Sequence, residues 1–143
     1  MKRNVKKVAI FVALFVSLIT LTVVVHAAGE SMGYKLACID GKCGDKMVEA
    51  RFHSLLRQLS STYAENPEQI ADLTVTAQRL LKEEGVSESL LNIMEGMNQL
   101  FSTTKGLKYA EYASAYITLR VQGRSHASAI VGLKALLQGL GLY

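Results

Sequence analysis

Tryptophan is missing from this chain, proline occurs once, and only two cysteines and three histidines are present. A structural zinc site takes about four cysteine or histidine ligands, usually in paired clusters, so this small supply argues against one. The sequence also lacks a glycine-rich phosphate loop, a nucleophile elbow and a paired-histidine metal motif. We therefore expect no metal and no cofactor, and no group of residues stands out as catalytic.

Acidic residues are missing from the N-terminal segment, which explains the formal net charge of +4. Residues 1–27 contain four of the sixteen lysines and arginines and none of the twelve aspartates and glutamates. Without this segment, twelve residues of each sign remain and the net charge is zero. A neutral domain lacks the electrostatic footprint of a protein that binds nucleic acid or anionic lipid.

The same segment, residues 1–27, has the pattern of a bacterial export signal. Its basic end is followed by an uncharged apolar run at 8–25 and by small residues up to Ala27, where we expect cleavage. The alternative is an uncleaved anchor in the inner membrane. Eighteen helical residues at about 1.5 Å each extend over roughly 27 Å, close to the thickness of a hydrocarbon core. In both cases we expect an exported protein, periplasmic or extracellular, with membrane contact through 8–25 only if uncut.

Beyond residue 44 the apolar residues recur at spacings of three and four, which is typical of amphipathic helices, and no convincing strand pattern appears. Helix starts are marked by the capping residues Asp45, Asn66, Ser87 and Ser125, and Asn66 has Gln69 at the position that a capping box requires. Gly96 falls inside a helical stretch, where it indicates a close helix contact. We predict an all-α fold, a small bundle of four to five helices. The expected divisions are a signal at 1–27, a disulfide-loop lead-in at 28–44 and the helical bundle at 45–143.

The helix expected at 107–122 is apolar over about 200° of its circumference, which predicts a central position in the bundle. A stripe of tyrosines with an arginine next in line runs along it. Tyrosine and arginine are enriched at binding hot spots, so this stripe is a candidate partner-binding surface. The alternative is that the rings pack against other helices and the hydroxyls reach the rim. The stripe consists of Tyr109, Tyr112, Tyr116 and Arg120.

Both cysteines, Cys38 and Cys43, lie in one short stretch. Exported thiols meet oxidants, and Asp40-Gly41 is a turn dipeptide that brings the two together, so we predict a disulfide. A metal site and a redox centre are the alternatives, although a redox pair prefers two intervening residues. The pattern Cys-x-Asp-Gly-x-Cys-x-Asp resembles short cysteine loops in a conjugative mating-pair stabilisation family of bacteria. The resemblance covers eight residues, and we infer no function from it.

Three further features have both a structural and a functional interpretation. Residues 119–133 resemble a DNA-binding helix-turn-helix, but the neutral charge and the export signal favour a plain helical hairpin. Glu49, His53 and Arg57 follow one another at four-residue spacing, and the first two form a conceivable acid–base pair. We expect a solvated helix face there instead. His126 lies in the first turn of its helix, where we expect a partly buried, neutral histidine.

These patterns predict an exported helical interaction protein without catalysis, an accessory component of a bacterial envelope or secretion assembly. Its partner is expected to be a protein of the cell envelope rather than a nucleic acid. Two other classes stay open: a membrane-active helical protein, and a small hydrolase that uses Glu49 and His53. The neutral charge and the capped, one-sided helices argue against membrane activity.

Overall fold

The computed structural model describes residues 30–100 and 106–141, so the predicted export signal and anchor lie outside the described residues. The described part is all-α, as predicted, with six helices instead of four to five and one isolated β-bridge between Tyr63 and Leu107. The helices are α2 (Met32–Ile39), α3 (Lys46–Thr62), α4 (Pro67–Glu83), α5 (Leu90–Asn98), α6 (Tyr109–Val121) and α7 (His126–Gly139).

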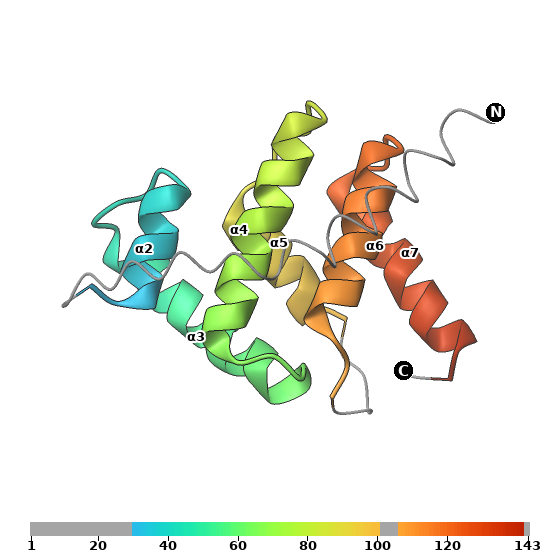
Figure 1. The fold of residues 1–143 in the computed structure, drawn as a ribbon, viewed down its shortest axis with the longest axis horizontal. Helices are drawn as coiled ribbons and strands as arrows, with labels where there is room; N and C mark the ends of the chain where they lie inside the picture. The colour runs from blue at the N-terminus through green and yellow to red at the C-terminus, as the bar shows by residue number, and fades with distance from the viewer. Residues whose placement is uncertain (1–29, 101–105, 142–143) are drawn as a thin grey trace.

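The helices follow one another across the molecule in the order of the sequence (Figure 1). Helices α2 and α3 lie at one end, α4 and α5 in the middle, and α6 and α7 at the other end. Helix α4 contacts α2, α3, α5 and α6, whereas α6 contacts α4, α5 and α7. The prediction that the helix at 107–122 is the central one is therefore wrong. Its wide apolar surface is explained by the three helices that enclose it.

Helix α2 is the element that the sequence did not predict, because residues 28–44 were expected to form a loop. Its N-cap is Ser31, whose hydroxyl accepts a hydrogen bond from the backbone N–H of Tyr34 at 3.2 Å. Helix α2 lies directly against α3, since a Cβ at Gly33 would lie 2.6 Å from the carbonyl oxygen of Glu49. Eight residues are too few to show a helical period, and packing supplies the stability that propensity cannot.

The predicted disulfide between Cys38 and Cys43 is present and ties the end of α2 to the turn before α3. Gly41 makes this turn with a φ of 74°, a left-handed conformation that favours glycine. Asp45 then caps α3, as predicted, by accepting hydrogen bonds from the N–H groups of Met47 and Val48. The cysteine loop is thus a short, closed connection that leads directly into the N-cap of α3.

The N-cap residue predicted from the sequence is correct for α4 and wrong for α5. Asn66 and Gln69 form the predicted capping box at the start of α4. The expected cap of the next helix, Ser87, is wrong: α5 begins at Leu90, and Ser89 is its N-cap. The hydroxyl of Ser89 accepts from the N–H of Asn92, and the carboxylate of Asp40, from another part of the chain, accepts from the first N–H groups of α5.

The hydrophobic core is formed by aliphatic and aromatic side chains from all six helices. The close contact predicted at Gly96 is present, because a Cβ there would lie 2.7 Å from Cδ1 of Ile130 on α7. In the part of the chain that the structure describes, no helix is both long and apolar enough to cross a membrane. The largest fully buried side chains include Phe52, Leu55, Leu59, Ile70, Leu81, Ile93, Met94 and Met97.

Candidate functional site

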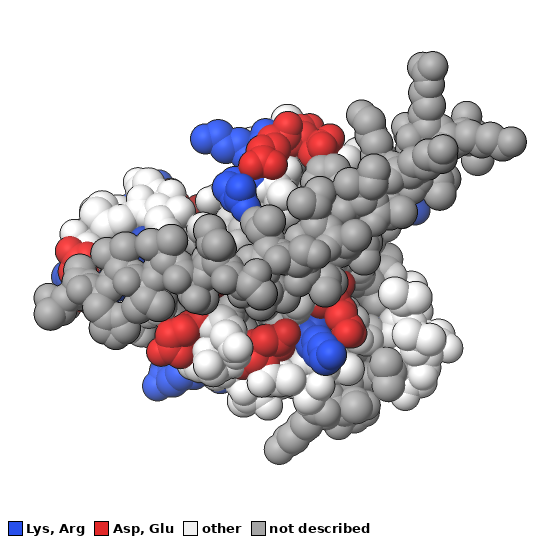
Figure 2. All heavy atoms as spheres, in the orientation of Figure 1, with Lys and Arg blue, Asp and Glu red and all other residues white. Residues whose placement is uncertain are grey.

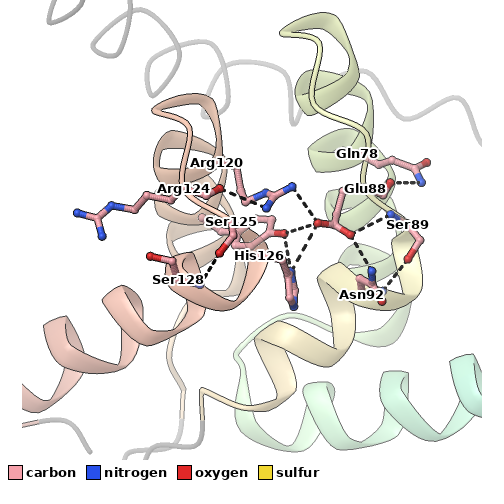
Figure 3. Close-up of polar contacts among 10 residues, drawn as sticks. Gln78, Glu88, Ser89, Asn92, Arg120, Arg124, Ser125, His126 and Ser128 are labelled. Atoms are coloured by element: carbon pink, nitrogen blue, oxygen red, sulfur yellow. Dashed lines mark hydrogen bonds and ion pairs between the residues drawn. The ribbon is translucent and has the colours of Figure 1, made fainter.

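A buried carboxylate lies where three helices meet. Glu88 belongs to the connection between α4 and α5, and its side chain is only 7% exposed. Arg120 reaches it from α6 and His126 from the start of α7 (Figure 3). Tyr116, one turn before Arg120, completes the group, which we call the Glu88 cluster. Burying a charge costs free energy unless the charge is paired and hydrogen-bonded, so the partners of Glu88 determine what the cluster does.

Both carboxylate oxygens of Glu88 are occupied. The guanidinium Nη2 of Arg120 lies 3.1 Å from Oε2, and the hydroxyl of Tyr116 donates to the same oxygen at 3.3 Å. On the other side, Asn92 Nδ2 donates to Oε1 at 2.8 Å, and the backbone N–H of Ser89 lies 3.3 Å from it. An ion pair with supporting hydrogen bonds is the arrangement in which a buried carboxylate is tolerated.

His126 joins the cluster through Tyr116. Its Nδ1 lies 2.8 Å from the tyrosine hydroxyl and 3.7 Å from Oε2 of Glu88. Burial, and after it the neighbouring charge of Glu88, raises the pKa of Tyr116, so the phenol stays protonated. The hydroxyl of Tyr116 has one proton to donate, either to the carboxylate of Glu88 or to the imidazole of His126. If it donates to the carboxylate, its oxygen accepts a hydrogen bond from Nδ1–H of His126. Tyr116 therefore links His126 to Glu88 through its hydroxyl group.

A second acid connects the Glu88 cluster to the cysteine loop. The carboxylate of Asp40 accepts hydrogen bonds from the N–H groups of Leu90 at 2.7 Å and Leu91 at 3.2 Å. It also accepts one from Nε2 of Gln78 at 3.1 Å, and the same amide donates to the backbone carbonyl of Glu88 at 3.0 Å. Helix α4 therefore joins the disulfide-closed loop to the residue at the centre of the cluster.

Helix α6 is capped in the same way, by an acid from elsewhere in the chain. Its own N-cap residue, Lys108, makes no side-chain capping bond. Instead, Glu65 accepts hydrogen bonds from the N–H groups of Tyr109 at 2.8 Å and Ala110 at 3.2 Å. A carboxylate at this end of a helix also suits the helix dipole. The helix that supplies two members of the Glu88 cluster is thus held in place at both ends.

The residues of the predicted tyrosine stripe lie in different surroundings in the structure. Tyr116 and Arg120 come together in the Glu88 cluster. Tyr109 is fully buried elsewhere, with its hydroxyl 2.7 Å from Oγ1 of Thr74, and burial raises its pKa. Tyr112 is half-buried at the rim. Of the three rings, Tyr112 is the one that solvent reaches, and partner binding along the stripe stays a prediction.

Glu49 and His53 on α3, a conceivable acid–base pair that we expected to be part of a solvated helix face, are arranged differently from that expectation. Glu49 is buried beneath α2, and its carboxylate lies 3.0 Å from Nζ of Lys46, so the expectation of a solvated position is wrong for this residue. His53, four residues later, is exposed, and its ring lies beside Gly33 of α2. The extra helix explains the difference, because α2 covers a part of α3 that a loop would have left open.

Sequence patterns missed the acid at the centre of the cluster. Glu88 and its supports Asp40, Gln78 and Asn92 have no local signal, because each is a single polar residue in a turn or on a helix face. Arg120 and His126 were noted, one as a candidate contact and the other as a partly buried histidine. Within residues 30–100 and 106–141, no group of three or more His, Cys, Asp and Glu side chains is arranged to hold a metal ion.

Comparison with known proteins places the chain in a family. Residues 36–137 match the family model described as MoxZ. The matched range runs from the second half of α2 to the second half of α7 and includes the disulfide and the Glu88 cluster. Neither curated proteins nor solved structures gave a match. Since the family model covers well over half of the sequence, the chain belongs to the MoxZ family.

Proposed function

We propose that this protein is an exported accessory protein that acts by binding another protein and has no catalytic activity of its own. The MoxZ family is associated with accessory proteins of a methanol oxidation system, and the proposal places this chain in the envelope part of such a system. The partner is then a protein component of the same system.

The observation that carries the proposal is the closed geometry of the Glu88 cluster. A catalytic carboxylate has to reach its substrate. The carboxylate of Glu88 is almost fully buried, and both of its oxygens are taken by groups of the same chain. The cluster joins the α4–α5 connection to α6 and α7, and it therefore supports a structural role for these polar residues. We therefore attribute partner binding to the outer surfaces of the helices that the cluster holds in place.

Two features support an exported location. A disulfide between Cys38 and Cys43 suits an oxidising compartment such as the periplasm. The sequence of residues 1–27 has the basic, apolar and small-residue order of an export signal. Both are consistent with a partner on the outer side of the cytoplasmic membrane.

Chemical crosslinking in the native host, grown on methanol, tests the proposal. The expected result is a covalent adduct between this chain and a protein of the methanol oxidation system, identified by mass spectrometry. A strain without the gene is expected to grow poorly on methanol and normally on a carbon source that needs no methanol oxidation. Adducts with lipid alone, or equal growth of the two strains on methanol, would contradict the proposal.

A further inference from the structure

The disulfide between Cys38 and Cys43 lies at the surface of the described structure. Cys43 is exposed and Cys38 is half-buried, and every residue from 41 to 47 is exposed. The α2–α3 connection that contains them lies at the left edge of the molecule in Figure 1, and Figure 2 shows a mostly white surface in the same place. Dithiols can reach an exposed disulfide, and labile or regulatory disulfides are found among the exposed ones.

The surroundings of Cys43 favour its reduced form. The hydroxyl of Tyr34 lies 3.5 Å from Sγ of Cys43, and the hydroxyl is the donor because a disulfide sulfur has no proton. Nζ of Lys46, at the start of α3, lies 6.0 Å from the centre of the Tyr34 ring. A nearby donor, a cation and a helix N-terminus all stabilise a thiolate. Lys46 also pairs with Glu49, so the Tyr34 hydroxyl is the main contribution.

The ring that the disulfide closes contains Asp40, whose carboxylate binds groups outside the loop. It accepts hydrogen bonds from the N–H groups of Leu90 and Leu91 on α5 and from Nε2 of Gln78 on α4. The backbone N–H groups of residues 40–42, in contrast, all donate to carbonyl groups of α2. Asp40 is thus the residue that transmits the position of the closed loop to α4 and α5.

We propose that the Cys38–Cys43 disulfide is a reducible site for a protein dithiol, and that its reduction loosens the hold of Asp40 on the start of α5. With the bond closed, residues 38–43 form a ring in which Asp40 has few conformations. With the bond open, the same residues gain conformational freedom, which lowers the population with the carboxylate at the first N–H groups of α5. Since Gln78 also donates to the backbone of Glu88, the change extends to the α4–α5 connection. This inference does not depend on the proposed function.

The reaction is a thiol–disulfide exchange in two steps. A thiolate of the dithiol attacks Sγ of Cys43, the more exposed sulfur, so that a mixed disulfide forms and Cys38 leaves as a thiolate. The second thiolate of the dithiol attacks its partner sulfur in the mixed disulfide and releases the Cys43 thiolate beside the Tyr34 hydroxyl. Two electrons pass from the dithiol, which becomes a disulfide, and its two protons end on Cys38 and Cys43.

A bond with a purely structural role would behave differently. Structural disulfides of exported proteins resist reduction by thiols. Their loss acts on the unfolded chain and therefore weakens the whole folded structure, without preference for one helix start. Accessibility in the folded state and a selective effect on α5 are the two properties that separate a reducible site from such a bond.

Reduction of the folded, exported protein tests the accessibility. The protein is equilibrated with graded ratios of reduced and oxidised dithiothreitol, and its thiols are counted by alkylation and mass spectrometry. We expect both cysteines to be reduced while far-ultraviolet circular dichroism stays helical. A protein that resists dithiothreitol when folded, at concentrations that reduce it in urea, overturns the inference.

The Tyr34 hydroxyl is tested in the same titration. Tyr34→Phe should shift the equilibrium toward the disulfide roughly fivefold, the effect of one hydrogen bond. Tyr112→Phe, on the rim of α6, is the matched control and should leave the equilibrium unchanged. Equal equilibria for the two variants would show that the hydroxyl does not stabilise the reduced form, and would overturn this part of the inference.

Amide hydrogen exchange tests the effect on α5. Reduction should speed exchange at Leu90 and Leu91 roughly tenfold more than at Tyr109 and Ala110, which corresponds to losing about 1.4 kcal/mol at a helix cap. The two amides of α6 are the matched control, because they are also capped by a remote carboxylate, that of Glu65 in the α3–α4 connection. Equal acceleration at all four amides would show a purely structural bond and overturn the inference.

The Asp40→Ala variant tests whether the carboxylate transmits the change. Reduction of this variant should speed exchange at the first amides of α5 and α6 equally, because α5 has already lost its remote acceptor. Far-ultraviolet circular dichroism verifies that the variant is folded. If reduction still speeds the α5 amides more than the α6 amides, transmission through Asp40 is wrong.

Discussion

The carboxylate of Asp40 accepts a hydrogen bond at 2.7 Å from the backbone N–H of Leu90, fifty residues further along the chain. It thereby caps α5 from the cysteine loop, in addition to the local cap supplied by Ser89. Through Gln78 the same carboxylate is connected to the backbone of Glu88. The disulfide, the start of α5 and the Glu88 cluster are therefore parts of one connected structure.

Asp40→Ala is expected to lower the free energy of unfolding by about 1–2 kcal/mol, because the first N–H groups of α5 lose an acceptor. Urea unfolding measures this loss, and amide hydrogen exchange at Leu90 and Leu91 should become faster. Asp72→Ala is the control, since Asp72 is exposed on α4 and its effect should stay within about 0.5 kcal/mol. Equal effects of the two substitutions would show that the remote cap contributes nothing.

Arg120→Met is expected to cost about 3–5 kcal/mol, because the buried carboxylate of Glu88 loses its guanidinium. The double variant Arg120→Met with Glu88→Leu removes both charges and should recover most of this loss. Guanidinium chloride unfolding of the wild type, the two single variants and the double variant gives the coupling energy. Arg79→Met, which breaks an exposed pair with Glu83, should cost less than about 1 kcal/mol. A double variant no more stable than Arg120→Met would rule out the ion pair as the cause.

Gly96→Ala is expected to be destabilising although alanine favours helices. The added methyl group would lie 2.7 Å from Ile130 Cδ1 and 2.9 Å from His126 Cε1, and Ile130 is buried with little room to move. Overpacking of about 1–3 kcal/mol exceeds the gain in helix propensity of at most about 1 kcal/mol. Gly139→Ala in α7, where a methyl group meets nothing within 4 Å, should be neutral or stabilising. Thermal unfolding that shows the same sign for both variants would contradict the close contact.

Stability is expected to fall with rising pH above about 10, because burial raises the pKa values of Tyr63, Tyr109 and Tyr116 above their ordinary value of 10.0. Below that pH these phenols are protonated in both the folded and the unfolded chain, so their full contribution to the free energy of unfolding is present. At higher pH the unfolded chain releases these protons first, so the free energy of unfolding falls by up to about 1.4 kcal/mol per pH unit for each tyrosine.

Phenolate absorbance and far-ultraviolet circular dichroism, followed together from pH 8 to 13, test the pH dependence. The buried tyrosines should ionise only as helix is lost. Tyr109→Phe should make the fall of the free energy of unfolding with pH less steep, by the contribution of one tyrosine. Ionisation of all six tyrosines near pH 10 in a chain that keeps its helices would be inconsistent with the burial of Tyr63, Tyr109 and Tyr116.

Reduction of the disulfide is expected to lower the free energy of unfolding by about 2 kcal/mol, the chain-entropy value for so short a loop. The Cys38→Ser, Cys43→Ser double variant should show a similar loss without reductant, and reductant should leave its stability unchanged. Alkylation of the exported protein under denaturing conditions should detect no free thiol. Two titratable thiols would show that the bond is not formed in the host.

Features with a local signal could be predicted from the sequence. The Asn66 capping box, the Asp45 cap and the cysteine loop depend on residues within a few positions of one another, and the structure has all three. Gly96 was identified correctly for the same reason, as a residue out of place within a helical stretch. Capping and turn preferences are properties of short segments and can be recognised without knowing the fold.

The candidate site could be predicted only in part. Arg120 and Tyr116 were selected as members of a stripe, but the pattern could not show that they face a buried carboxylate. Glu88 looks like an ordinary polar turn residue in the sequence. Its role depends on residues from α6 and α7, and no spacing rule relates positions that far apart.

The sequence by itself determined the helical fold class, most helix starts and the disulfide, because these follow from periodicity, capping chemistry and cysteine spacing. Only the tertiary structure decided that α2 covers Glu49 and that Asp40 and Glu65 cap helices far from them in the chain. It alone decided that Glu88 is buried against Arg120. These outcomes depend on which surfaces meet when helices pack, and packing contacts join residues without any local pattern between them.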